Sequence, residues 1–151
     1  MRFDECSGEA AKAGVAAVLA LASLAAMPVG QAHADQDLEL TLQETGKRDY
    51  YCRATFQLSG PEDLPFQDIN GFFYVFVDDE QVGRSRGASF RFTDGGNTAS
   101  ATFETPNAPC PDVNGYVFVV GACMRGNGFV DRAECAAAIA PAAPVREVKE
   151  R

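Results

Sequence analysis

Cysteine side chains carry the most easily assigned chemistry in this sequence. Four of them follow an apolar N-terminal segment, namely Cys52, Cys110, Cys123 and Cys135. Their wide spacings match no CxxC-type zinc pattern, whereas separated cysteines in an exported chain ordinarily form disulfides. The cysteines therefore predict two structural disulfides, with no metal site and no cofactor.

The pairing of these cysteines follows from the expected strand order, although four cysteines allow three connectivities. If the strand holding Cys52 pairs antiparallel with the strand before Cys110, the two sulfurs lie at the same end. If the strand ending at Cys123 forms a hairpin with the segment after Cys135, those two cysteines face each other. We therefore expect Cys52–Cys110 and Cys123–Cys135.

Catalytic groups are scarce. The only histidine, His33, precedes the predicted cleavage point, so a mature chain would have no Ser-His-Asp or Cys-His unit. Carboxylates remain, but they gather in predicted turns: Asp78, Asp79 and Glu80, and Glu62, Asp63 and Asp68. Paired carboxylates hydrolyse glycosides only when held about 5–9 Å apart around a cleft. We expect that the protein is not an enzyme.

The loop between Cys123 and Cys135 is the predicted binding surface. A disulfide-closed loop is pre-organised, and aromatic and arginine side chains dominate binding hot spots. The expected contact residues are Met124, Arg125, Asn127, Phe129 and Arg132. Alternatively, Phe129 packs beneath the loop and the arginines are only solvated.

The same loop is similar to the second half of an EF-hand calcium loop. Gly128 would take the turn position and Glu134 the bidentate position, with Asn127 and Asp131 as further oxygen donors. Arg125 would stand where that family has a carboxylate, so a chance match is favoured. Asp131 and Glu134 also form a capping-box pattern for a short helix.

An export signal is predicted at the N-terminus. Residues 14–29 are apolar but shorter than the about 20 residues of a membrane span, and Ala32-His33-Ala34 resembles a cleavage site. The expected organisation is a signal peptide over 1–34 cleaved after Ala34, a domain over 35–141 and a mobile charged tail over 142–151. The protein would then be periplasmic or secreted, without a stable membrane anchor.

The charge is acidic, with a formal net charge of -8 at pH 7. The thirteen Lys and Arg residues are dispersed, whereas nucleic-acid binding rewards clustered basic residues. Nucleic acid is therefore excluded as an expected partner.

The apolar and polar pattern predicts six strands, at 38–43, 50–58, 71–77, 88–93, 99–104 and 116–122. Turns are expected at 46–49, 78–81 and 94–97, the last with hairpin chemistry. The continuously apolar 71–77 suits a central strand covered on both faces. Residues 136–140 form either a seventh, edge strand or a short helix. The pattern predicts an all-β, six- to seven-stranded antiparallel sandwich.

In strand number and length, residues 37–141 resemble small secreted bacterial sandwich domains of the fibronectin-type-III-like and immunoglobulin-like kinds. The immunoglobulin marks are missing, since the chain has no Trp and Gly121 stands where the tyrosine corner would lie. The resemblance therefore implies a fibronectin-type-III-like fold and no particular function.

The leading functional prediction is a non-enzymatic module that binds another protein through residues 124–134. One alternative is a small acidic inhibitor of a cationic secreted hydrolase of the lysozyme type, and another is a weak calcium-binding domain. An exposed edge strand could also pair two copies of the chain.

Overall fold

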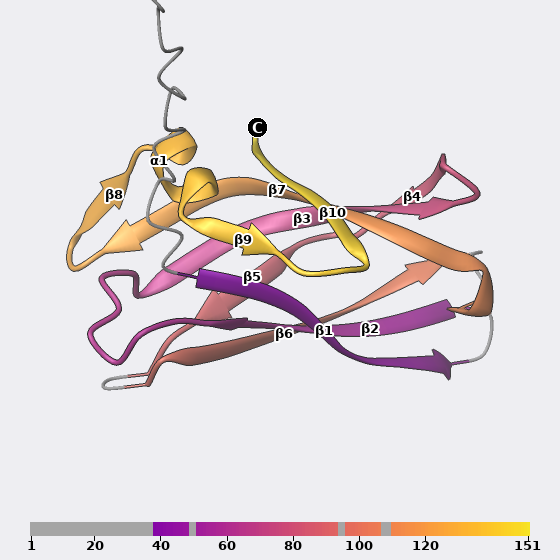
Figure 1. The fold of residues 1–151 in the computed structure, drawn as a ribbon, viewed down its shortest axis with the longest axis horizontal. Coiled ribbons are helices and arrows are strands. Elements are labelled where there is room, and N and C mark those ends of the chain that lie inside the picture. Colours follow the sequence, from indigo (N-terminus) through magenta and orange to yellow (C-terminus); the bar gives the residue numbers. More distant parts are fainter. Residues whose placement is uncertain (1–37, 49–50, 94–95, 107–109) are drawn as a thin grey trace, which may run out of the picture. The chain divides into compact units, whose positions relative to one another are not determined.

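Two β-sheets make up the fold in the computed structural model, which describes residues 38–48, 51–93, 96–106 and 110–151 (Figure 1). The elements are β1 (Leu38–Arg48), β2 (Tyr51–Ser59), β3 (Asp68–Val77), β4 (Glu80–Arg84), β5 (Ala88–Arg91), β6 (Thr98–Pro106), η1 (Cys110–Asp112), β7 (Val113–Arg125), β8 (Gly128–Val130), α1 (Arg132–Ala137), β9 (Ile139–Pro141) and β10 (Val145–Glu150). In this described part, no helix is long and apolar enough to span a membrane.

The strands form a four-stranded sheet in the order β6-β2-β1-β9 and a six-stranded sheet built on β10-β7-β3-β4. In the second sheet, β5 pairs with β3 and β8 pairs with β7. The inner faces of the two sheets share one apolar core, so the predicted β-sandwich is confirmed at this level.

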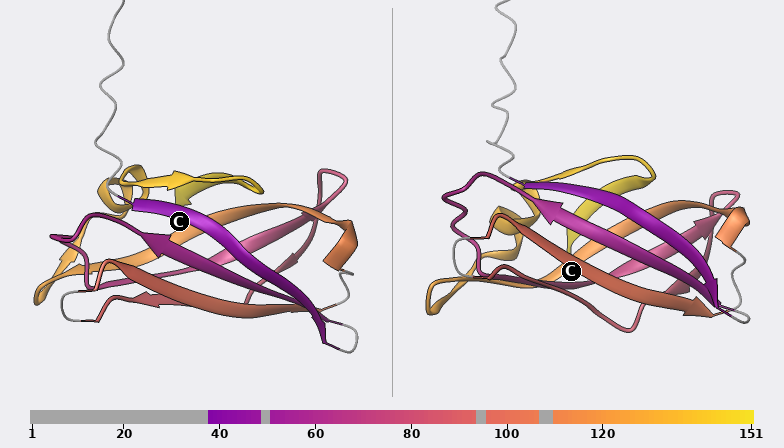
Figure 2. Two further views of the ribbon diagram at one scale, coloured as in Figure 1. Left: turned by 60° about the horizontal axis from the view of Figure 1, so that its bottom comes forward. Right: turned by 90° about the horizontal axis from the view of Figure 1, so that it is seen from below.

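Two parallel pairings correct the prediction of six or seven antiparallel strands. β9 runs parallel to β1, and β10 runs parallel to β7. Parallel neighbours need a long crossover connection, which β8, α1 and β9 supply between β7 and β10. In Figure 2, β9 (yellow) lies beside the start of β1 (indigo), with which it pairs.

The predicted mobile tail over 142–151 is also wrong for most of its length. Val145 is buried in the core and Val148 packs against it, opposite Tyr116 and Phe118 of β7. A bulge between Val145 and residue 147 lets both valines face inward. Because charged residues surround these two valines, the sequence shows no regular alternation that would predict a strand here.

Two predicted turns also differ from the structure. β1 continues to Arg48, through most of the turn expected at 46–49, because its end pairs with the start of β2. The connection near 94–97 does not make a hairpin, since β5 pairs with β3 and β6 pairs with β2. It crosses between the sheets, and residues 94–95 lie outside the described part.

The expected turn after β3 is a two-residue hairpin turn. Asp78 and Asp79 both have positive φ, 47° and 67°, as the type I′ geometry requires. The Asp79 carboxylate also pairs with the Arg146 guanidinium of β10 at 2.7 Å. This ion pair links the hairpin turn to the strand at the opposite edge of the same sheet.

Phe73 of β3 lies at the centre of an aromatic core. Its ring stacks on Phe56 and Phe103 of the other sheet, with centroid distances of 4.4 and 4.8 Å. Within its own sheet it packs against Phe118 at 4.7 Å. Phe73 therefore joins the two sheets.

The outer face of β3 is apolar as well, as its continuous hydrophobic sequence predicts. Phe72 is buried there beside Val117 and Val119 of β7. Basic side chains of the described residues lie over this face. The Arg84 guanidinium lies 3.7 Å from the centroid of the Phe72 ring. Arg146 and Lys149 lie over Phe76 and Tyr74 in the same way. Long basic side chains thus provide the cover.

Tyr116 gives the core a pH dependence. Burial raises the pKa of its phenol to about 12 from an ordinary value of 10. Since the folded-state pKa lies above the unfolded one, this contribution to stability is present below pH 10 and lost between about pH 10 and pH 12. We expect the free energy of unfolding to fall by about 2–3 kcal/mol over that window. Denaturant titrations of Tyr116→Phe, which has no phenol there, should show a shallower fall; an equal fall would contradict the assignment.

Candidate functional site

The clamped loop, residues 124–134 between Cys123 and Cys135, forms a hairpin followed by a helix. β8 pairs with the end of β7, placing Met124 opposite Phe129 and Arg125 opposite Gly128. Gly126 has a φ of 57°, a conformation that favours glycine at this turn. The loop therefore has a defined backbone.

Disulfides join Cys52 to Cys110 and Cys123 to Cys135, the pairing expected from the strand order. Their Cα–Cα distances are 4.8 and 6.4 Å. The second bridge arises differently from the expectation, because Cys135 lies in α1 and not beside a strand of a hairpin. Both of its cysteines are fully buried, so the base of the clamped loop is fixed in the core.

Asp131 begins α1 as the capping pattern predicts. Its Oδ1 accepts hydrogen bonds from the backbone N–H groups of Ala133 and Glu134, at 2.9 and 3.3 Å. The helix ends at Ala137, and Ile139–Pro141 then pair with β1 as β9. Residues 136–140 thus contain the end of a helix and the start of a strand, the two alternatives expected from the sequence.

Phe129 is the most exposed large apolar side chain among the described residues, at 81%. This excludes the alternative in which its ring packs beneath the loop. Met124 is half-buried opposite it, and Arg132 is exposed at the start of α1. Asn127 is exposed at the hairpin turn. Of the predicted binding residues, Phe129 and Met124 are thus cross-strand partners.

Arg125 supports the loop rather than pointing freely into solvent. Its guanidinium donates to a Glu134 carboxylate oxygen at 3.0 Å and lies 5.2 Å from the Phe66 ring centroid. The Met124 carbonyl accepts from the Gln67 N–H at 2.9 Å. These contacts tie the first end of the clamped loop to the residues before β3 and the two ends of the loop to each other.

Two of the three predicted calcium donors, Asp131 and Glu134, make other contacts in this loop. Asp131 caps α1, and Glu134 is paired with Arg125. Across the part of the chain that the structure describes, no three His, Cys, Asp or Glu side chains gather in a metal-binding arrangement. The geometry gives the calcium alternative no support.

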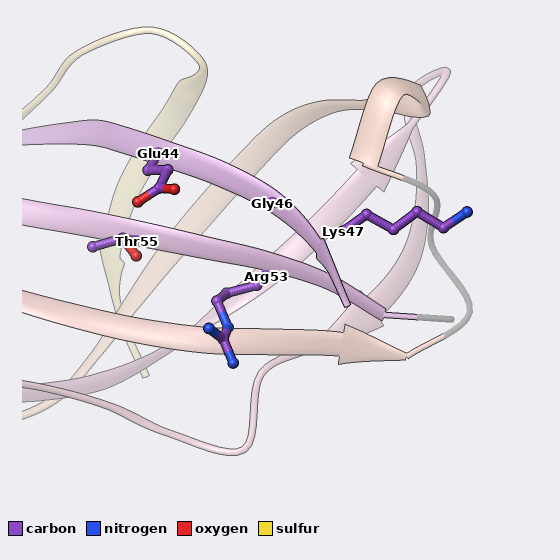
Figure 3. Close-up of a pocket in the computed structure, with 5 residues that line it drawn as sticks. All are labelled: Glu44, Gly46, Lys47, Arg53 and Thr55. Carbon is purple, nitrogen blue, oxygen red and sulfur yellow. The ribbon is translucent and has the colours of Figure 1, made fainter. Parts of the chain in front are cut away.

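Two hollows were not predicted, because residues distant in the sequence form them. One, of about 460 Å³, lies over β1 and β2 and is lined by Glu44, Gly46, Lys47, Arg53 and Thr55 (Figure 3). In Figure 3 the Lys47 side chain extends away from Glu44 and Thr55, so its ammonium group does not converge with the Glu44 carboxylate. The other hollow contains three arginines and is treated below.

These features define a disulfide-bonded, two-sheet β-sandwich protein with an aromatic side chain exposed on a fixed loop. The two disulfides indicate an oxidising, extracytoplasmic compartment.

Comparison with known proteins supports the fold alone. No protein-family model and no curated protein matches this sequence. The structure is similar to that of IrmA from Escherichia coli, with a TM-score of 0.57 and 12% sequence identity. The match covers 71% of this chain and 92% of the IrmA chain.

Proposed function

We propose that this protein is an exported, non-enzymatic binding module that contacts another protein through its clamped loop. The observation that carries the proposal is the 81% exposure of Phe129 on a loop whose backbone is fixed by a buried disulfide. An exposed aromatic ring on an ordered backbone loses little conformational entropy when a partner covers it.

The neighbours of Phe129 suit a protein partner. Met124 offers a polarisable apolar surface across the hairpin, and Arg132 adds an exposed guanidinium nearby in the chain. Aromatic and arginine residues surrounded by less important contacts are typical of interface hot spots. Asn127 at the turn supplies a polar rim.

Export and the finer fold assignment belong to the same proposal. Cleavage after Ala34 would release the sandwich into the periplasm or the medium, where its two disulfides are stable. The two-sheet architecture supports a fibronectin-type-III-like sandwich. The ten strands of the described part and the parallel pairings of β9 and β10 are departures from it.

The inhibitor alternative receives less support from the surface. An acidic inhibitor of a cationic hydrolase requires carboxylates around its contact surface. The two hollows have more basic than acidic side chains in their lining: Lys47, Arg53, Arg84 and Arg86 against Glu44 and Glu104.

Replacing Phe129 with alanine tests the proposal. The oxidised wild-type protein, immobilised and exposed to native periplasm or medium, should retain partners that Phe129→Ala loses by about tenfold or more, since hot-spot truncation costs about 2 kcal/mol or more. Thermal stability should stay unchanged because the ring is exposed.

Val82→Ala is the matched control, since Val82 is an exposed apolar side chain at 42% on β4, outside the clamped loop. It should retain every partner that the wild type retains. Equal retention by Phe129→Ala and the wild type would show that the clamped loop is not the binding surface.

A further inference from the structure

A second concave surface lies at the side of the sandwich where an edge of each sheet meets. It has a volume of about 780 Å³, and its walls come from β2 and β6 on one side and from the β4–β5 connection on the other. We call it the arginine groove, and its side chains include Tyr51, Arg53, Arg84, Arg86, Thr102 and Glu104. β6 is an edge strand of its sheet and β4 an edge strand of the other.

Ser85 fixes the segment that carries two of the arginines. It is buried, its Oγ accepts from the Phe73 N–H at 2.9 Å, and its own N–H donates to the Phe73 carbonyl at 2.8 Å. Because Ser85 faces the core, its neighbours Arg84 and Arg86 are exposed on either side of it. The Arg84 guanidinium is further positioned by its contact with the Phe72 ring.

The charges in the groove are only partly balanced. The Arg53 guanidinium pairs with Glu104 at 3.0 Å. Neither Arg84 nor Arg86 forms an ion pair with a carboxylate within the described residues. Three arginines thus meet one glutamate in a hollow of a protein whose net charge is -8.

This charge distribution favours a short anionic ligand over a long one. A long polyanion would leave the groove and meet an acidic protein surface, which would repel it. Guanidinium groups bind carboxylates through strong, charge-assisted hydrogen bonds. Tyr51, 42% exposed, adds an aromatic surface, and a groove between two strand edges suits an extended chain.

We propose that the arginine groove binds a short, extended acidic segment of a partner protein, with its carboxylates on Arg84 and Arg86 and its backbone along the edge of β6. The site is separate from the clamped loop and goes beyond the function proposed above. It would give a role to the three arginines that line one hollow of an acidic chain.

The test uses a labelled peptide in which glutamate alternates with serine, and fluorescence anisotropy with the oxidised full chain. Wild-type protein should bind this peptide, and binding should weaken as salt is raised. A peptide with glutamine in place of glutamate should bind at least tenfold more weakly. Arg86→Glu should also weaken binding at least tenfold, and Arg86→Gln by a smaller factor.

Arg132→Glu is the control, because it changes the net charge of the protein equally but lies in α1. It should bind the acidic peptide within about twofold of the wild type. Phe129→Ala should do the same, which separates this proposal from the function assigned to the clamped loop. Unchanged melting temperatures would show that the variants are folded.

Three results would overturn the proposal. The first is equal weakening by Arg86→Glu and Arg132→Glu, which would reveal only a net-charge effect. The second is equal binding of the glutamine peptide. The third is displacement of the labelled peptide by inorganic phosphate, when the phosphate supplies the same concentration of negative charge as an unlabelled acidic peptide that displaces it. That result would make the groove a general anion site.

Discussion

Replacement of Phe73 by alanine is expected to lower the free energy of unfolding by about 3–5 kcal/mol, the largest single-residue effect in this sandwich. Phe73 is fully buried and contacts aromatic rings of both sheets, with centroids 4.4 Å from Phe56 and 4.8 Å from Phe103. Truncation removes these contacts and leaves a cavity that a sheet-to-sheet interface closes poorly. Guanidinium denaturation followed by circular dichroism measures the loss.

Two further variants keep this prediction testable if Phe73→Ala does not fold. Phe73→Leu retains part of the volume and should cost less, about 1–2 kcal/mol. Phe129→Ala removes an identical group from an exposed position and should change stability by less than about 0.5 kcal/mol. Equal stabilities of the Phe73 and Phe129 variants would contradict the central role of Phe73.

Removal of the Cys52–Cys110 bridge should have the second large effect. It closes a loop with a sequence separation of 58, against 12 for Cys123–Cys135. Loop-closure entropy predicts losses of about 4 kcal/mol for the first and about 3 kcal/mol for the second. The free energy of unfolding of each paired Cys→Ala variant measures these values.

The two bridges should also differ in what their removal does to binding. Cys52→Ala with Cys110→Ala should weaken the fold but leave the clamped loop intact. Cys123→Ala with Cys135→Ala should release the base of that loop. This variant should therefore lose more affinity for its partner than the Cys52→Ala, Cys110→Ala variant does, although it loses less free energy of unfolding. Retained partner binding in the second variant would show that the bridge does not pre-organise the loop.

The core strands were predictable because their environments are simple. Every second residue of these strands faces one core, as do Leu38, Leu40, Phe56 and Leu58, so the sequence alternates between apolar and polar residues. The role of Asp131 as the helix cap was equally predictable, because the capping pattern lies within a few neighbouring residues. The Cys52–Cys110 pairing followed from the pairing of β2 with β6, whereas Cys123–Cys135 was predicted from a hairpin after Cys135 that the structure replaces with α1.

The remaining features depend on contacts that no local pattern records. β10 is short and rich in charge, and only its pairing with β7 distinguishes Val145 and Val148 from a solvated tail. The turn chemistry near Asn97 suits a hairpin, yet the two flanking strands joined different sheets because β3 and β2 were their better partners. The arginine groove likewise unites β2, β4 and β6, whose residues are separated by tens of positions.

The parallel pairing of β9 with β1 has a consequence for how the protein reaches its fold. Leu38 pairs with Ile139, and about a hundred residues lie between them in the sequence. Contacts of such large sequence separation slow folding, because the chain loses the entropy of closing a long loop before the contact contributes any stabilisation. Until residues 139–150 arrive, the outer edges of β1 and β7 stay unpaired and can associate with other chains. The interval before these residues arrive is thus the time at which this protein is most exposed to aggregation.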